Sequence, residues 1–265
     1  MAERPTAIVT GASSGIGAAL ARVLAREGHD LVLVARSGAP MQTLAGEIEG
    51  AHGISTVVLP KDLASPDAAD ELADAIAQRG NAPDVLVNSA GFTQLSPFVT
   101  SDERVMTALL RVNIEALTRL TRRLVPGMVD RGHGRIVNLS SNAAFQPGPG
   151  MACYYASKAY VLSFTIALHE ELRGTGVTAT ALCPGPTESG FQARADMEDA
   201  KVVTRNRLAT SEEVAEWGWR EAEAGRSHAV YGARWRAFAF GTRLLPRDLA
   251  ARIAAGTNER DASRS

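Results

Sequence analysis

Tyr154 and Lys158 combine side-chain types and a spacing that suit proton transfer. The surrounding pattern predicts a helix over about 154–173, on which residues four apart share one face. A neighbouring ammonium favours the ionised form of a phenol, so Lys158 should lower the pKa of Tyr154. The pair can then give a proton to a developing alkoxide, or accept one in the reverse direction. Surface residues often share this spacing, and Tyr155, three residues from Lys158, is a second candidate.

A glycine-rich turn near the N-terminus has the features of a phosphate site. It follows an apolar run at 7–10 and precedes a predicted helix at about 16–28. Glycines let the backbone approach a pyrophosphate closely, and the helix N-terminus supplies N–H groups and a positive dipole end. The spacing GxxxGxG differs from the general GxGxxG fingerprint, and a plain tight turn is the alternative. The residues that we assign to this site are Gly11, Ser13, Ser14, Gly15, Ile16 and Gly17.

The end of the second apolar run indicates which dinucleotide would bind. NAD-binding turns place an acidic residue about 20 residues on, where it bonds the ribose 2′-hydroxyl. Here the run ends in Ala35-Arg36-Ser37, without a carboxylate. An arginine can bind a 2′-phosphate through charge-assisted hydrogen bonds. Arg36 therefore favours NADP(H) as the cofactor.

The chain alternates short apolar runs with longer helical patterns. The runs lie at 7–10, 31–35, 56–59, 84–88, 135–139, 177–182 and 228–231, and the helical patterns at about 16–28, 41–51, 67–79, 102–125, 154–173 and 211–224. Nearly continuous apolar runs are typical of parallel strands buried on both faces. We expect a three-layer α/β fold, a Rossmann-like doubly wound parallel sheet of about seven strands with helices on both faces. One domain should cover residues 1–256, followed by a disordered tail at 257–265.

The polar candidates converge on one edge of this sheet. Ser140-Ser141 follows the fifth strand, Asn88 to Gly91 follows the fourth, and Pro184-Gly185 follows the sixth. Ligands of open α/β sheets bind at the carboxyl ends of the strands. This shared position argues against a chance surface pair at Tyr154 and Lys158.

Together these motifs resemble the short-chain dehydrogenase/reductase family, in its single-domain branch. The resemblance covers about residues 5–240 and rests on TGASSGIG at 10–17, NSAG at 88–91, Asn113, Ser141 thirteen residues before Tyr154, YxxxK at 154–158 and PG at 184–185. The thirteen-residue offset favours Tyr154 over Tyr155, and Ser141 over Ser140.

The resemblance also implies roles for these residues. Tyr154 would be the acid/base, Ser141 would bond the substrate oxygen, and Lys158 would bond the nicotinamide ribose. Asn113 would hold the water of a proton relay that reaches Lys158. The other expected cofactor contacts are Asp62 and Leu63 at the adenine, Asn88 and Ala90 at the adenosine ribose, Gly91, Pro184 and Gly185, and Thr187 and Ser189 at the nicotinamide carboxamide.

Two positions depart from the family pattern. NSAG replaces the commoner NNAG, although backbone rather than the Ser89 side chain approaches the cofactor there. Pro186 and Thr187 stand where the family often has an aliphatic residue, which weakens the expected carboxamide contact.

The family pattern places the substrate beside three loops, whose mostly apolar residues suit a hydrophobic ketone or alcohol. The candidates are Phe92, Gln94, Asn142, Ala143, Phe145, Met151 and Phe191, any of which could instead merely pack a loop. The polar stretch from Gln192 to Asn206 is expected to form a mobile lid.

Composition limits the remaining partners. The net charge of −1 argues against nucleic acid, and neither the two cysteines nor the five histidines cluster into a metal site. The start of the chain lacks a signal-peptide layout, so we expect a reducing, cytoplasmic setting. The resemblance implies a homodimer or homotetramer paired through the helices of Asn113 and Tyr154.

The C-terminal stretch from Arg226 onward is rich in arginine and interleaves apolar side chains. One interpretation is a basic amphipathic segment that touches a membrane surface or a partner. The interpretation that we favour is a helix that packs on the core or on another subunit, with its arginines in water.

The functional hypothesis is therefore hydride transfer between NADP(H) and a carbonyl or secondary alcohol of an apolar substrate. Within the family, a 3-oxoacyl-thioester reductase and a hydroxysteroid dehydrogenase are alternatives. An alternative of another class is a non-catalytic NADP(H)-binding regulator, against which the complete set Asn113, Ser141, Tyr154 and Lys158 speaks.

Overall fold

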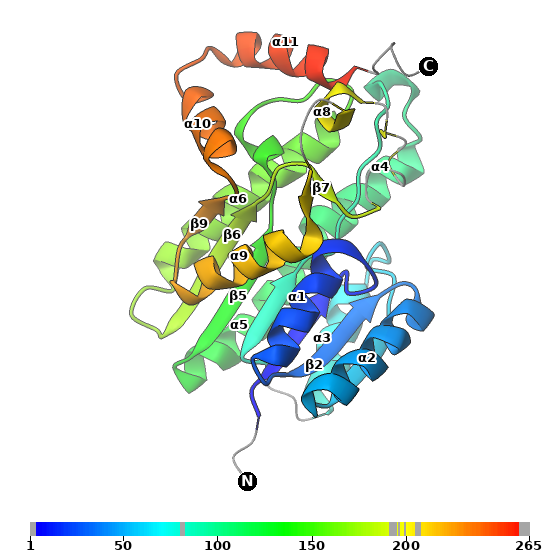
Figure 1. Cartoon of the computed structure of the whole chain (residues 1–265), viewed down its shortest axis with the longest axis vertical. Coiled ribbons are helices and arrows are strands. Elements are labelled where there is room, and N and C mark those ends of the chain that lie inside the picture. The colour runs from blue at the N-terminus through cyan, green and yellow to red at the C-terminus, as the bar shows by residue number, and fades with distance from the viewer. Residues whose placement is uncertain are drawn as a thin grey trace.

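A seven-stranded parallel sheet forms the centre of the protein, seen here in a computed structural model (Figure 1). The structure describes residues 4–79, 83–190, 195, 197–198, 200–204 and 208–259. The strand order is β3-β2-β1-β4-β5-β6-β9, and every neighbouring pair is parallel. The chain thus builds outward from β1 in both directions, which confirms the doubly wound α/β fold.

The strands agree closely with the apolar runs of the sequence. Their bounds are β1 (Thr6–Thr10), β2 (Asp30–Ala35), β3 (Thr56–Pro60), β4 (Val85–Asn88), β5 (Gly134–Leu139), β6 (Val177–Cys183) and β9 (His228–Val230), with a short parallel pair formed by β7 (Thr187–Glu188) and β8 (Ala209–Thr210). The main helices are α1 (Gly15–Arg26), α2 (Gly38–His52), α3 (Ala68–Ala77), α4 (Glu103–Leu110), α5 (Leu117–Arg131), α6 (Ala152–Glu171), α8 (Lys201–Thr204), α9 (Ser211–Glu223), α10 (Ala233–Gly241) and α11 (Arg247–Asn258). A π-helical turn, Arg111–Ala116, joins α4 to α5.

Alternate residues of each strand enter two separate apolar cores, one on each face of the sheet. Val9 and Leu33 pack with α1, α2 and α9 on the face toward the viewer in Figure 1. Ile8 and Val32 pack with α3 and α5 on the opposite face. This two-sided burial explains why the strands read as continuous apolar runs instead of alternating ones.

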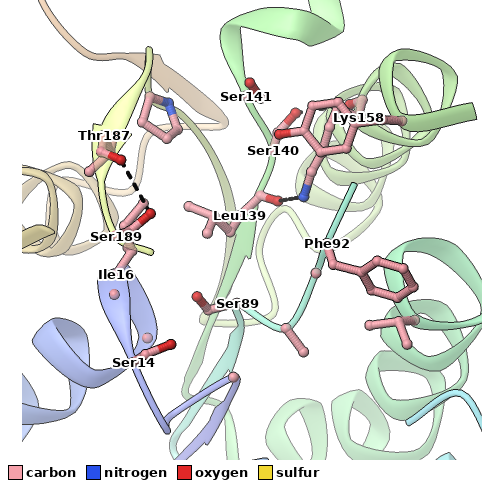
Figure 2. Close-up of a pocket in the computed structure, with 18 of the residues that line it drawn as sticks. Ser14, Ile16, Ser89, Phe92, Leu139, Ser140, Ser141, Lys158, Thr187 and Ser189 are labelled. Carbon is pink, nitrogen blue, oxygen red and sulfur yellow. Dashed lines mark hydrogen bonds between the residues drawn. The ribbon is translucent and has the colours of Figure 1, made fainter. Parts of the chain in front are cut away.

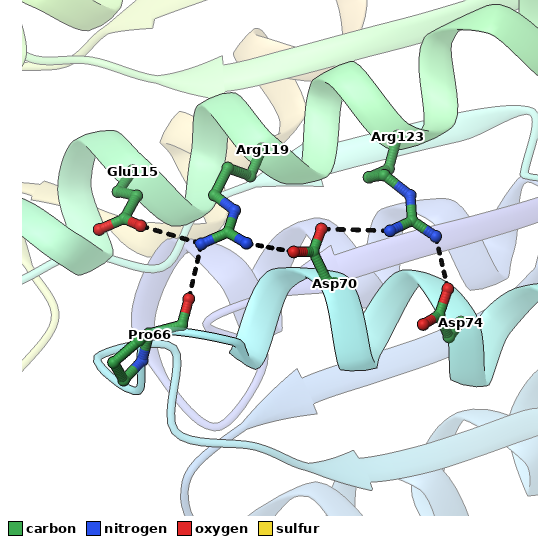
Figure 3. Close-up of polar contacts among 6 residues, drawn as sticks. All are labelled: Pro66, Asp70, Asp74, Glu115, Arg119 and Arg123. Atoms are coloured by element: carbon green, nitrogen blue, oxygen red, sulfur yellow. Dashed lines mark hydrogen bonds and ion pairs between the residues drawn. The ribbon is translucent and has the colours of Figure 1, made fainter.

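Ion pairs link α3 to α5 across the outer surface of the second face (Figure 3). Arg119 bonds Asp70, and Arg123 bridges from Asp70 at 3.2 Å to Asp74. Arg119 also donates to the Pro66 carbonyl at 2.7 Å. Exposed pairs of this kind contribute little free energy each, so the network mainly orients α5 against α3.

The C-terminal region differs from expectation. We predicted a disordered tail from residue 257, but α11 continues to Asn258, whose side chain is 4% exposed. Asn258 is ordered because its side chain hydrogen-bonds to residues in the body of the protein. Residues 260–265 lie outside the described part. Alanines of α10 and α11 face the core, and Phe240, Leu244 and Ile253 are exposed. No helix within the described residues combines the length and the apolar character that a membrane crossing requires.

Buried amides and hydroxyls form a chain of hydrogen bonds across the middle of the sheet. Asn88 donates to Asn138 at 2.9 Å and to Thr121 on α5 at 3.1 Å. Asn138 in turn donates to Thr165 on α6 at 2.9 Å. All four side chains are at most 3% exposed, so each bond satisfies a group that water does not reach.

This network predicts a large loss of stability for Asn138→Ala. The substitution removes one buried hydrogen bond from the Asn88 amide and one from the Thr165 hydroxyl, at a cost of about 1–3 kcal/mol. Urea unfolding would measure it, with Ser96→Ala, which removes an exposed hydroxyl, as the control. A loss no larger than that of the control would contradict the role assigned to the network.

Candidate active site

A cavity of about 660 Å³ opens at the carboxyl edge of the sheet. Residues that follow six of the strands line it, from the glycine turn after β1 to Pro184 and Gly185 after β6. The loops thus bring together residues that are far apart in the sequence. Figure 2 shows one part of this cavity, with Ser14 and Ile16 of the turn on one side and Ser141 and Lys158 on the other.

The glycine turn is packed so tightly that two of its residues must be glycine. A Cβ on Gly17 would lie 2.4 Å from the Gly11 carbonyl oxygen. Gly11 has a φ of +72°, and a Cβ there would lie 2.9 Å from the backbone of Ala90. The turn therefore lies directly against the β4 loop, with the first-turn N–H groups of α1 facing the cavity edge, where they have no intrahelical acceptors.

Thr10 fixes the β4 loop in this position, a role that we did not assign from the sequence. Its hydroxyl accepts hydrogen bonds from the backbone N–H groups of Ser89 and Ala90, both at 3.1 Å. Thr10 is 2% exposed, so the bonds are shielded from water. The sequence does mark this residue, because Thr10 ends β1 and directly precedes Gly11.

The far end of the cavity carries the residues expected at the adenosine. Arg36, Asp62 and Leu63 all line it, and Arg36 is exposed. Lys61 lines the same end and pairs with Glu71 at 2.8 Å. Lys61 was not predicted, although it directly follows β3 at the edge where ligands bind. The two basic residues make this end of the cavity suited to an anion.

The near end holds Ser141, Tyr154 and Lys158 beside one another. The Lys158 ammonium donates to the Leu139 carbonyl at 2.8 Å and lies 5.7 Å from the centre of the Tyr154 ring (Figure 2 shows the former bond). The Ser141 hydroxyl donates to Asn142 at 3.1 Å and accepts from the Ala143 N–H at 3.1 Å. Ser141 comes from the loop after β5, and Tyr154 and Lys158 come from α6; all three line the cavity.

Burial dominates the protonation of this group and overturns one expectation. It raises the pKa of Tyr154 to about 12, while a hydrogen bond with Ser141 lowers it in part. It also lowers the pKa of Lys158 to about 8. We expected Lys158 to depress the pKa of Tyr154, but the loss of hydration on burial is the larger effect. The phenol therefore keeps its proton at neutral pH.

The competing residues Tyr155 and Ser140 are engaged elsewhere. The Tyr155 hydroxyl donates to Asn258 at 3.0 Å, and its side chain packs in a small apolar cluster with Met151. The Ser140 hydroxyl donates to the Lys158 carbonyl at 2.9 Å and so ties β5 to α6. The geometry agrees with the choice of Tyr154 and Ser141 as the pair beside Lys158.

Two predicted residues lie behind the cavity wall. Asn113 is 1% exposed, and its amide exchanges two hydrogen bonds with the backbone of Phe92, each 3.1 Å. Its position in the π-helical turn brings it there, and it also donates to Ser157 on α6 at 3.2 Å. Asn88 is absent from the residues that line the cavity, and its side chain belongs to the buried network described above; its expected contact with the ribose stays a prediction.

The remaining predicted cofactor residues all border the cavity. They are Gly11, Ser13, Ser14, Gly15, Ile16, Gly17, Ala90, Gly91, Pro184, Gly185, Thr187 and Ser189. This set combines a glycine turn at a helix N-terminus with the basic residues Arg36 and Lys61, which suits a dinucleotide chemically.

The substrate predictions divide into three groups. Phe92, Asn142, Ala143 and Met151 line the cavity. Gln94 instead lines a separate cavity of about 30 Å³, and Phe145 lines neither. Phe191 and much of the expected lid, 192–206, lie outside the described residues. Leu139, Pro186, Met197 and Val203 also line the main cavity, and we did not predict them.

Among the residues that the structure describes, no three His, Cys, Asp or Glu side chains gather closely enough to hold a metal ion.

The lowered pKa of Lys158 predicts a specific pH dependence of stability. Between about pH 8 and 10.5 the folded protein holds fewer protons at this site than the unfolded chain, so its stability rises with pH. Lys158→Met removes this effect. We expect the difference between the free energies of unfolding of wild type and variant to shift in favour of the wild type by up to about 1.4 kcal/mol per pH unit in this range. Denaturant unfolding from pH 7 to 10 measures the difference, and a difference that does not change with pH would refute the buried ammonium.

Comparison with known proteins agrees with the geometry. Residues 5–200 match the family model of the short chain dehydrogenases. A short chain dehydrogenase of Pseudocercospora fijiensis is 37% identical over 193 residues, covering 72% of this chain and 62% of that protein. The very-long-chain 3-oxoacyl-CoA reductase of Homo sapiens is 33% identical over 182 residues, covering 67% of this chain and 58% of that protein. The chain thus spans about three fifths of these curated relatives.

A solved structure extends the likeness over most of the chain. The short-chain dehydrogenase from Sphingobium yanoikuyae, in complex with NADPH, superposes with a TM-score of 0.81 and is 33% identical, covering 91% of this chain and 94% of that one. Sequence motifs, sheet order and site geometry all lead to the same conclusion: the chain belongs to the short-chain dehydrogenase family of oxidoreductases.

Proposed function

We propose that this protein is an NADP(H)-dependent reductase or dehydrogenase that interconverts an apolar ketone and its secondary alcohol. The observation that carries the proposal is the placement of Tyr154, Ser141 and Lys158 on one wall of the cavity whose other parts hold the glycine turn and Arg36. A proton donor and a dinucleotide site thus share a single space, as carbonyl reduction requires.

The assignment of NADP(H) rests on the charged side chains at the adenosine end of the cavity. Arg36 and Lys61 border the adenosine end, and no acidic side chain directly follows β2. A guanidinium there favours a 2′-phosphate over a free hydroxyl. The likeness to a structure solved with NADPH supports the same choice.

The side chains divide the chemistry among them. When bound, the reduced nicotinamide would supply the hydride. The Tyr154 hydroxyl gives its proton to the substrate oxygen, on which negative charge develops, and Ser141 donates a hydrogen bond to the same oxygen. The Lys158 ammonium stabilises the phenolate that remains. Asn113 holds the Phe92 backbone, so it positions the wall that faces the substrate.

The protonation states favour reduction at neutral pH. With its pKa raised to about 12, Tyr154 is protonated and ready to donate. Lys158, with a pKa of about 8, is still mostly charged at pH 7. Alcohol oxidation needs the phenolate instead, and burial, which raises the Tyr154 pKa, disfavours the phenolate at neutral pH.

The substrate end is mainly apolar, with Phe92, Ala143, Met151 and Val203 in its lining. This composition suits a hydrophobic ketone. A 3-oxoacyl thioester is the second candidate, supported by the likeness to the human very-long-chain 3-oxoacyl-CoA reductase. A hydroxysteroid would also suit an apolar wall of this kind.

Assembly and compartment complete the proposal. Leu110 on α4 is 41% exposed and Tyr160 on α6 is 39% exposed, so the helices near Asn113 and Tyr154 present apolar side chains for pairing with a second copy. Two subunits, or four, would cover this face. Cys153 and Cys183 are both free thiols, which suits the reducing cytoplasm that we propose.

Tyr154→Phe tests the catalytic assignment. We expect the variant to keep its affinity for NADPH and to lose at least about a hundredfold in kcat, because the proton donor is gone. The assay follows NADPH absorbance with a panel of apolar ketones and 3-oxoacyl thioesters. Tyr231→Phe, a tyrosine outside the cavity, is the control. Undiminished turnover in Tyr154→Phe would sink the assignment, and NADPH binding without turnover of any substrate in the wild type would favour a regulatory protein.

Arg36→Asp tests the cofactor assignment. The new carboxylate repels a 2′-phosphate and can bond a 2′-hydroxyl, so the dissociation constant for NADPH should rise about a hundredfold while that for NADH changes little. Fluorescence titration measures both constants. Arg104→Asp makes the same charge change outside the cavity and should alter neither. A wild-type preference for NADH would refute the argument from Arg36.

A further inference from the structure

The last residues that the structure describes return to the substrate end of the cavity. Asn258, at the end of α11, accepts a hydrogen bond from the Tyr155 hydroxyl at 3.0 Å. Its amide also donates to the Pro149 carbonyl at 3.0 Å. The residue is 4% exposed, and more than a hundred positions separate it from either partner. A buried amide that far along the chain thus ties α11 to the catalytic helix and to the loop before it.

The next residue, Glu259, contacts a different segment, α8. The Glu259 carboxylate pairs with the Lys201 ammonium at 2.7 Å, and the Glu259 carbonyl accepts from the Lys201 N–H at 3.0 Å. Lys201 begins α8, the short helix that carries Val203 into the cavity lining. Figure 1 shows α11 crossing the end of the molecule close to α8. Two successive residues therefore fasten two separate segments of the cavity wall.

The wall that they fasten is continuous. Tyr155 packs with Met151, Ala195, Met197 and Ala200 in one apolar cluster. A Cβ on Gly148 would lie 2.3 Å from the Tyr155 ring, so the loop before α6 rests directly on that ring. Of this set, Tyr155, Met151 and Met197 also line the main cavity. Moving Tyr155 would therefore move the surface that a substrate touches.

We propose that Asn258 is a positioning residue that determines substrate specificity: it holds Tyr155 and the loop before α6 in place as the wall of the substrate end. The proposal rests on the proposed function, since it assigns the determinant of fit for that same reaction. Asn258 does not line the cavity, so it acts through the side chain and the loop that it bonds. The glycine turn and Arg36 lie at other strands of the sheet.

Loss of the Asn258 amide has a predictable consequence. In Asn258→Ala the Tyr155 hydroxyl and the Pro149 carbonyl lose their buried partner, and both can regain hydrogen bonds only by moving toward water. The wall then no longer matches a bulky substrate. Binding of that substrate weakens, whereas proton donation by Tyr154 and cofactor binding continue.

The experiment compares steady-state kinetics of the full-length chain with a bulky and a small apolar ketone. For Asn258→Ala we expect KM for the bulky ketone to rise about tenfold, with kcat within about twofold and the NADPH dissociation constant unchanged. Tyr155→Phe removes the same bond from the other side and should reproduce most of this change. The double variant should add little to either single one, because the two substitutions break one shared bond.

Thr257→Ala supplies the matched control. It lies on the same turn of α11, and its hydroxyl donates to the Ala254 carbonyl within the helix, so the kinetic constants should stay at their wild-type values. Thermal unfolding of every variant, with and without NADPH, reports on folding separately from fit. A variant that is merely less folded loses apparent kcat at an unchanged KM, which is a different signature.

Two results would overturn the proposal. One is an unchanged KM for the bulky ketone in Asn258→Ala, even where the melting temperature falls. The other is full additivity of the Asn258 and Tyr155 substitutions. Failure of the proposed function has its own signature, since the wild type would then turn over neither ketone although it binds NADPH.

Discussion

All seven strands of the central sheet run parallel, and this constraint determines where the residues of the candidate site lie. Helices cover both faces, so the strands must be apolar on both sides, and polar residues gather where the strands end. Because the carboxyl ends of parallel strands share one edge, residues scattered over the chain meet there. The residues that follow the strands at this edge are Gly11, Arg36, Lys61, Ser89, Ser140 and Pro184, and all of them line the cavity.

Burying the polar groups of this edge costs free energy unless they find hydrogen-bond partners. Thr10 caps two backbone N–H groups of the β4 loop, and Asn113 bonds the backbone of Phe92 further along the same loop. Asn88 and Asn138 satisfy each other beneath it. These buried bonds leave the loop little freedom, which is why the glycine turn can pack against it at van der Waals distance. Structural polar residues thus prepare the site on which the reactive ones act.

The fold and most of the cavity lining could be predicted from the sequence, because strand periodicity and edge position are local signals. What the sequence did not reveal depends on contacts between residues that are distant in sequence. The Asn88 side chain, for example, points inward to Asn138 on the next strand. Asn258 was placed in a disordered tail, since its partners lie near residue 150. The pKa of Tyr154 was expected to fall, whereas the extent of burial, which no spacing reveals, raises it.

The central claim is that the cavity brings a hydride donor and the Tyr154 proton to one carbonyl group. A single turnover with NADPH carrying deuterium at the transferable position tests it most directly. We expect an alcohol product with one deuterium on the carbinol carbon and none on the hydroxyl after exchange with water. An unlabelled product, or consumption of NADPH without formation of any alcohol, would contradict it.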